Sequence, residues 1–130
     1  MNITRATDYA FRLLVNLAAE KGEGSCRDIA EKINVPFSHL SKLVQRLQQG
    51  GILITKKGKG GGIKLAKPAS AISMAEVYRA MEGPVSLSDC LFHKDSCRFS
   101  RKCKVRVYLG KIQNQINRMF EEKSILELAI

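Results

Sequence analysis

Apolar positions in the N-terminal part of the chain recur at helical spacing. Over residues 3–20 they return every three or four positions, which predicts one amphipathic helix. A short second helix is predicted over 26–33, and a tight turn at Asn34-Val35-Pro36 separates it from a third. We expect Ser38 to cap the third helix and Gly50-Gly51 to end it. Two short helices joined by such a turn are typical of a helix-turn-helix.

Two β-rich runs, 52–55 and 62–66, follow the helix-turn-helix. Between them Lys56-Lys57-Gly58-Lys59-Gly60-Gly61 predicts the glycine-rich tip of a hairpin. A basic two-stranded wing directly after a helix-turn-helix indicates a winged helix. Ser73 then starts a further helix, which stops at Gly83-Pro84.

A last long helix is predicted over 104–122. Its apolar residues follow alternating four- and three-residue steps and form a heptad-like seam, made of Val105, Leu109, Ile112, Ile116 and Met119. The seam either packs on its own domain or joins two copies; we favour a dimer, because reading two half-sites on DNA needs two winged helices. The predicted fold is mainly α with a small β-hairpin wing. It comprises a winged helix-turn-helix domain over 1–83, a cysteine-rich loop over 84–103, and a dimerisation helix and tail over 104–130.

The composition is that of an ordinary globular chain with an excess of positive charge. Hydrophobic residues make up 45% of the 130 residues, and the formal net charge is +10. The sequence contains no apolar run of the roughly 20 residues that span a bilayer, and its first residues lack the features of a signal peptide. We therefore expect a soluble, cytoplasmic protein without a membrane partner. The charge points to a polyanion.

The distribution of charge favours nucleic acid over a merely solvated basic face. Residues 32–75 contain no acid, and their basic residues are Lys32, Lys42, Arg46, Lys56, Lys57, Lys59, Lys64 and Lys67. A second basic run, 94–106, surrounds the later cysteines and includes Asp95 as its only acid.

The candidate DNA-binding residues lie on the third predicted helix and on the wing. The second helix of a helix-turn-helix enters the major groove with its N-terminal residues at the base edges. The candidates on this helix are Ser38, His39, Ser41, Lys42, Gln45 and Arg46. Of these we expect Lys42 and Arg46 to contact phosphate. The wing adds Lys57, Lys59 and Gly60. Phe37, in contrast, is predicted to be a core or staple residue.

Four cysteines in a chain without a secretory signal do not indicate a disulfide framework. Cys26 is expected to be a small buried residue. Cys90, Cys97 and Cys103 lie in polar, loop-like sequence. Their spacing allows an iron–sulfur cluster, a zinc site completed by His93, or a thiol sensor without metal.

The chain resembles the winged-helix regulator family that includes IscR and NsrR. The matching features run over essentially its full length and are Ile3-Thr4-Arg5-Ala6-Thr7-Asp8-Tyr9-Ala10, Ile29-Ala30, Leu40, Leu43, Leu47, Gly51-Ile52-Leu53, Lys59-Gly60-Gly61-Gly62-Ile63 and the three late cysteines before a long helix. Members of this family are dimeric transcription regulators, and many carry a 2Fe–2S or 4Fe–4S cluster that controls DNA binding. The resemblance thus implies an iron–sulfur cofactor.

Carried over residue by residue, the resemblance assigns Cys90, Cys97 and Cys103 as cluster ligands. IscR-type members use a His three residues after the last cysteine, where this chain has Arg106. NsrR-type members can use an Asp in the first helix, supplied by the partner subunit, and Asp8 is at the matching place. His93 and a small exogenous ligand remain alternatives for the fourth ligand.

These features together predict a homodimeric transcription regulator, which we expect to be a repressor. It would bind a pseudo-palindromic double-stranded operator and release it when nitric oxide or oxidants attack an iron–sulfur cluster. The alternatives are an iron or cluster-status sensor of the same family, and a cluster-free thiol- or zinc-dependent regulator. An enzyme is not expected, because the sequence has no nucleophile–base pair and no phosphate-cradling loop.

Overall fold

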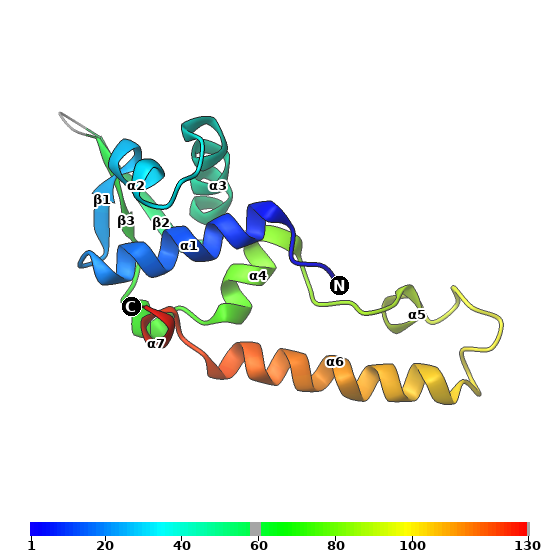
Figure 1. Cartoon of the computed structure of the whole chain (residues 1–130). Coiled ribbons are helices and arrows are strands. Elements are labelled where there is room, and N and C mark those ends of the chain that lie inside the picture. The colour runs from blue at the N-terminus through cyan, green and yellow to red at the C-terminus, as the bar shows by residue number, and fades with distance from the viewer. Residues whose placement is uncertain (58–60, 130) are drawn as a thin grey trace.

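The computed structural model describes residues 1–57 and 61–129 and has a mainly helical fold with one small sheet (Figure 1). The helices are α1 (Arg5–Ala19), α2 (Cys26–Lys32), α3 (Phe37–Gln49), α4 (Met74–Glu82), α5 (Asp89–Phe92), α6 (Lys104–Glu122) and α7 (Ile125–Leu128), with a 3-10 turn η1 (Ala69–Ala71). The strands are β1 (Glu23–Ser25), β2 (Leu53–Lys56) and β3 (Gly62–Leu65). This architecture confirms the predicted fold class.

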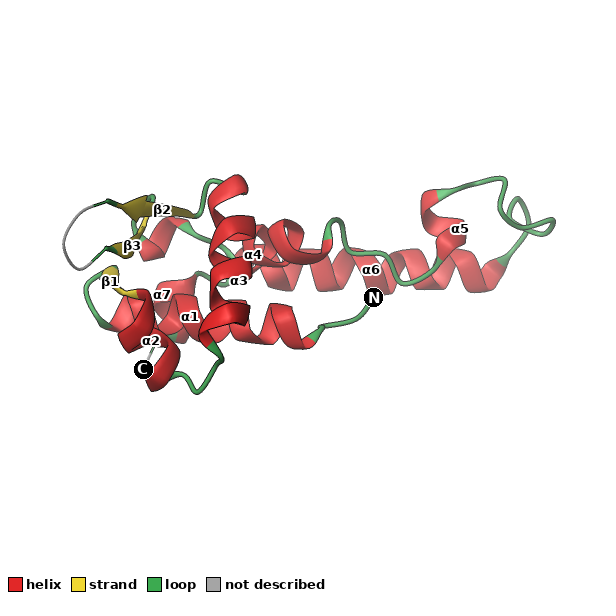
Figure 2. Ribbon diagram, turned by 90° about the horizontal axis from the view of Figure 1, so that it is seen from above, coloured by secondary structure: helices red, strands yellow, loops and turns green. Residues whose placement is uncertain are grey.

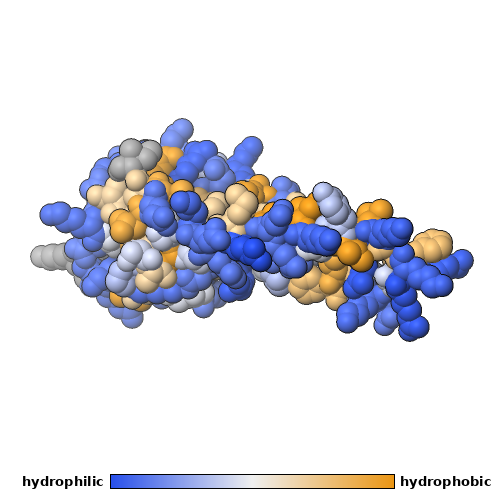
Figure 3. Space-filling model, turned by 90° about the horizontal axis from the view of Figure 1, so that it is seen from below, coloured by the Kyte–Doolittle hydropathy of each residue, from blue (hydrophilic) through white to orange (hydrophobic). Residues whose placement is uncertain are grey.

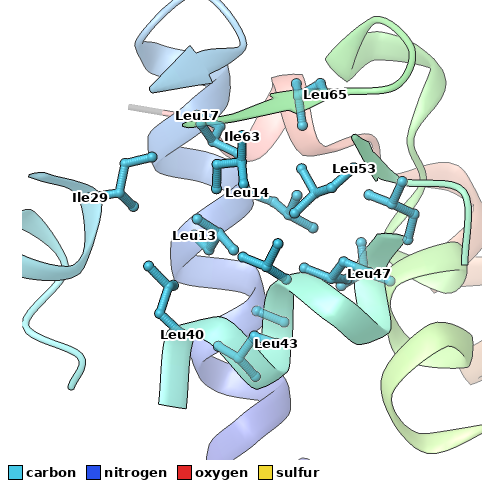
Figure 4. Close-up of a cluster of buried hydrophobic side chains, with 14 of the residues drawn as sticks. Leu13, Leu14, Leu17, Ile29, Leu40, Leu43, Leu47, Leu53, Ile63 and Leu65 are labelled. Atoms are coloured by element: carbon cyan, nitrogen blue, oxygen red, sulfur yellow. The ribbon is translucent and has the colours of Figure 1, made fainter. Parts of the chain in front are cut away.

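One hydrophobic core lies between α1, α3 and the sheet (Figure 4). Leu13, Leu14 and Leu17 of α1 and Leu47 of α3 are fully buried, as is Ile63 of β3. Each such side chain contributes about 1.5–3 kcal/mol relative to remaining in water. The helical spacing of these residues therefore fixes which faces of α1 and α3 turn inward, and hence which face of α3 stays exposed.

The sheet has three antiparallel strands in the order β1-β3-β2. The wing is the β2–β3 hairpin, in which Thr55 lies opposite Ile63. Strand β1, which pairs with β3, was not predicted, because three residues are too few to show an alternating pattern. Glycine is required at position 62, where β3 pairs with β1, since a Cβ there would lie 2.5 Å from the carbonyl oxygen of Gly24.

Helix α4 begins and ends as its local sequence predicts. Ser73 and Glu76 form a reciprocal capping box at its start. Gly83 ends it in the left-handed region, with φ +81. The chain then leaves the winged-helix body.

An extended arm, formed by the cysteine-bearing segment 84–103 and α6, projects from the body (Figures 1 and 2). Its base is held where the ring of Tyr78 lies 5.6 Å from that of Phe120. The chain then returns, because α7 docks on the body: Ile125 is fully buried and its N–H donates to the carbonyl of Ile72 at 2.8 Å. The sequence predicts only a dimerisation helix and tail over 104–130, without this docked helix.

Within residues 1–57 and 61–129, no helix is long and apolar enough to cross a membrane.

Candidate DNA-binding surface and cysteine segment

Helix α3 presents a polar face to solvent, because its apolar stripe is buried. Leu40, Leu43, Val44 and Leu47 form the stripe. On the opposite side of a helix with 3.6 residues per turn lie four of the predicted DNA contacts, which we call the reading face: Ser38, Ser41, Lys42 and Gln45. All four are exposed. The structure thus brings these four residues together on one surface.

The start of α3 differs from the prediction. Pro36, not Ser38, is the N-cap residue, and no side chain caps this terminus. The carbonyl of Pro36 accepts from the N–H of Leu40 at 3.0 Å, so the helix begins at Phe37, two residues earlier than a cap at Ser38 would allow. Phe37, predicted to be a core or staple residue, is 47% exposed instead.

Two other predicted contacts lie on the flank of α3 that faces α1. The ring of His39 lies 6.3 Å from that of Tyr9, and Arg46 donates to the carbonyl of Met81 at 3.3 Å. Arg5 of α1 and Lys42 of α3 help to line a groove of about 670 Å³ between the two helices, which also borders His39 and Arg46. The Arg46 guanidinium therefore already uses part of its hydrogen-bonding capacity within the protein.

The carboxylate of Glu82 joins the end of α4 to the start of α1. Glu82 accepts hydrogen bonds from the hydroxyl groups of Thr4 and Thr7, the latter at 2.5 Å, and from the Thr4 N–H at 3.3 Å. Thr7 is fully buried. Burial alone would raise the pKa of Glu82, but the threonine hydrogen bonds and the nearby Arg46 charge outweigh it and lower the pKa.

Only part of the predicted wing site lies in the described ranges. Lys57 is exposed, whereas Lys59 and Gly60 lie outside the described residues. Lys56 pairs with Glu23 of β1 at 2.5 Å, and this hydrogen bond lowers the pKa of Glu23. The Lys56 charge is thus partly neutralised by β1.

All four cysteines are free thiols in the structure. Cys26 is half-buried against the core, and burial raises the pKa of its thiol. Cys97 is exposed, whereas Cys90 and Cys103 are half-buried. The segment is therefore only partly covered by the rest of the chain.

Arg106 connects the two ends of the cysteine segment. Its backbone N–H donates to Cys103 Sγ at 3.3 Å, which makes Cys103 the N-cap of α6, and its Nε donates to the carbonyl of Cys90 at 2.9 Å. The residue that occupies the position of the missing histidine ligand thus holds two cysteines in place. The segment also contains α5, where only a loop was predicted.

The described residues gather no group of three or more His, Cys, Asp or Glu side chains suitable for a metal ion. The donor chemistry nevertheless fits an iron–sulfur cluster, since three unpaired thiols lie on one short, basic segment. The exposed His93 follows α5 on the same segment. The ligand assignments stay predictions.

Asp8 does not lie near the cysteines of its own chain. It is in the first turn of α1 and pairs with Arg12 at 2.8 Å, with both side chains about half exposed. Figure 1 places the cysteine segment at the far end of the arm, away from α1. Any contact between Asp8 and these thiols would therefore involve a second copy.

Helix α6 has an unusually exposed apolar surface. It contains no buried residue, and four of its large apolar side chains are at least 60% exposed: Val105, Val107, Tyr108 and Met119. Figure 3 shows apolar patches along this arm. Such a patch is typical of a protein interface.

Residues 3–129 match a family model described as "Rrf2: Iron-dependent Transcriptional regulator". The chain belongs to the Rrf2 family. Among Rrf2-like relatives, the HTH-type transcriptional regulator NsrR of Oceanobacillus iheyensis is 33% identical over 132 residues, covering 98% of this chain and 89% of the relative. NsrR of Halalkalibacterium halodurans is 30% identical over 131 residues, covering 98% and 90%.

Solved structures confirm the Rrf2 fold. CymR (YrzC), described as the global cysteine regulator of B. subtilis, superimposes with a TM-score of 0.79 at 22% identity, covering 99% of this chain and 96% of that one. T. potens IscR gives 0.77 at 18% identity, covering 98% and 85%. The relatives are transcription regulators and not enzymes, so this Rrf2 protein is a DNA-binding transcription regulator, as the sequence predicts.

Proposed function

We propose that this Rrf2 regulator is a cytoplasmic homodimeric repressor that binds a pseudo-palindromic operator. A 4Fe–4S or 2Fe–2S cluster controls its affinity for the operator, and this cluster reacts with nitric oxide or oxidants. The observation that carries the proposal is the set of three free thiols on a projecting arm, outside the hydrophobic core. None of these three thiols belongs to the hydrophobic core. The 33% identity to an NsrR supports the NsrR-type assignment, on which the choice of nitric oxide as the signal rests.

The dimer is supported by the exposed apolar surface of α6. Val105 and Met119, two members of the predicted seam, are 67% and 66% exposed in the single chain. A second α6 packed along this seam would remove both from water. The two reading faces would then be related by a two-fold axis, which suits a pseudo-palindromic operator.

Cys90, Cys97 and Cys103 would hold the cluster, with Asp8 of the other protomer as fourth ligand and His93 as the alternative. When bound, the cluster would supply a centre that reacts with nitric oxide and oxidants. The chain's own part is to position the thiols, and Arg106 does so for Cys90 and Cys103. The basic residues of 94–106 would offset negative charge on the thiolates.

As a ligand from the other protomer, Asp8 would connect the arm of one protomer with the DNA-binding surface of the other. It lies on α1 just after Thr7, whose hydroxyl binds Glu82, and Arg46 of α3 donates to the neighbouring Met81. Movement of the first turn of α1 would therefore reach α3 through these contacts. In the single chain Asp8 pairs with Arg12, so ligation would have to compete with this ion pair.

The test is anaerobic purification followed by measurement of iron, acid-labile sulfide and operator affinity before and after nitric oxide. Cys97→Ser should lose the cluster absorption and the nitric oxide response while the winged helix stays folded. Cys26→Ser is the matched control and should keep both. A colourless wild-type protein with stoichiometric zinc would contradict the proposal.

A cluster-free thiol regulator is the second candidate. The observation in its favour is that residues 1–57 and 61–129 gather no set of three metal ligands. In that case the wild-type protein would contain neither iron nor sulfide. Its operator affinity would still respond to a thiol oxidant, and Cys97→Ser would remove this response.

A further inference from the structure

Phe37 is an exposed aromatic side chain at the position where a recognition helix meets DNA. It is the first residue of α3 and is 47% exposed. Its neighbours Leu40 and Leu43 are buried in the core, so its exposure is not a consequence of a loosely packed helix. This exposed ring lies next to the hydroxyl groups of the reading face, and contact with an apolar group of a partner would remove it from water.

One contact holds the ring of Phe37, and two others hold its backbone. The guanidinium of Arg27, on α2, lies over it at 5.4 Å from the ring centroid. The hydroxyl of Ser41 donates to the carbonyl of Phe37 at 3.1 Å. Pro36 restricts the backbone just before it. Phe37 is therefore held at the edge of the reading face before any DNA arrives.

The phenyl ring itself offers nothing to a phosphate group, and charges of both signs border it. Arg27, Glu31 and Phe37 line the same hollow between α2 and α3, so the Arg27 charge beside the ring has the Glu31 carboxylate nearby. The phenyl ring has no hydrogen-bonding atom, so a polar base edge placed against it would lose a partner. In the major groove, the apolar group that a base presents is the 5-methyl group of thymine.

We infer that Phe37, supported by Arg27, contacts the methyl group of one thymine in each operator half-site. Phe37 thereby contributes to sequence specificity beside the polar reading face. The inference rests on the DNA-binding role of the chain and is independent of the proposed cluster.

The experiment begins by selecting an operator from a random double-stranded DNA library with the full-length wild-type protein. Each thymine is then replaced in turn by deoxyuridine, symmetrically in both half-sites, and affinity is measured by fluorescence anisotropy. Deoxyuridine removes only the methyl group. One position should weaken wild-type binding about fourfold per half-site, the ratio expected for the apolar surface of one methyl group.

Three variants locate the contact. Phe37→Ala should bind more weakly and lose the deoxyuridine effect at that position, whereas Phe37→Leu should keep part of it. Leu126→Ala, on α7 and 51% exposed, is the matched control and should behave as wild type. The salt dependence of Phe37→Ala should equal that of wild type, because no phosphate contact is lost.

The inference is overturned if no thymine in the selected operator is sensitive, or if Phe37→Ala keeps the wild-type sensitivity. It is equally overturned if the wild-type protein selects no sequence at all. A colourless, cluster-free protein that shows the expected thymine effect would refute the proposed cluster but support this inference.

Discussion

The Glu82 junction between α1 and α4 allows a quantitative prediction for Glu82→Ala. The substitution removes the acceptor of the Thr7 hydroxyl, and Thr7 is fully buried. A buried hydroxyl without its partner costs about 1–3 kcal/mol. The Thr4 contacts are only partly buried and add less. We therefore expect a loss of about 2–3 kcal/mol in the free energy of unfolding, a large part of the usual 5–15 kcal/mol.

Urea unfolding followed by circular dichroism at pH 7, with the protomer concentration held constant, measures this loss. The urea midpoint should fall by about 1–2 M. Glu82→Gln, which keeps an oxygen acceptor, should lose less. In a Thr7→Val background Glu82→Ala should cost clearly less than in the wild type, because no buried hydroxyl is then orphaned.

The same junction should be sensitive to acid. The folded protein holds the pKa of Glu82 below its ordinary value, so the charged carboxylate stabilises the fold above the ordinary pKa. This contribution is lost as the pH falls below about 4.5 and through the lowered pKa. The difference between wild type and Glu82→Gln should therefore shrink in acid. An unchanged midpoint for Glu82→Ala at pH 7, or additive effects with Thr7→Val, would refute the reasoning.

Three further predictions concern DNA binding, backbone strain and assembly. Lys42→Ala should weaken operator binding and reduce the salt slope by about one, measured by anisotropy over a salt series, whereas Arg46→Ala should change the slope less because Arg46 already donates to Met81. Gly83→Ala should lower the free energy of unfolding by about 1 kcal/mol or more, measured by urea, because φ is +81 there. Met119→Lys should convert the dimer to monomer in sedimentation equilibrium, and a dimer of unchanged stability would remove α6 as the interface.

Elements fixed by local chemistry could be predicted from the sequence. The helix that starts after Ser73 and ends at Gly83 follows from a capping box and a glycine, both of which act within a few residues. Helix α6 runs over Lys104–Glu122, as its apolar spacing predicts. The helical spacing of Leu40, Leu43, Val44 and Leu47 likewise accounts for the buried side of α3 and therefore for the exposure of the opposite side.

Features fixed by distant contacts could not be predicted. Helix α7 depends on Ile125 reaching the core beside η1, which no local pattern of four residues reveals. The exposure of Phe37 depends on where α2 crosses α3, because an aromatic residue before a helical stripe is equally typical of a hydrophobic staple. The internal contacts of Arg46 came from α4, and its sequence neighbours give no sign of them.

The return of the chain at α7 has a consequence for the integrity of the arm. Both ends of the excursion are anchored in the same body, one after α4 and the other through Ile125. A single cut in the exposed stretch between Cys97 and Cys103 would therefore leave two fragments that stay associated. The arm should survive nicking by a protease as a two-piece complex, with α6 still seated on the body.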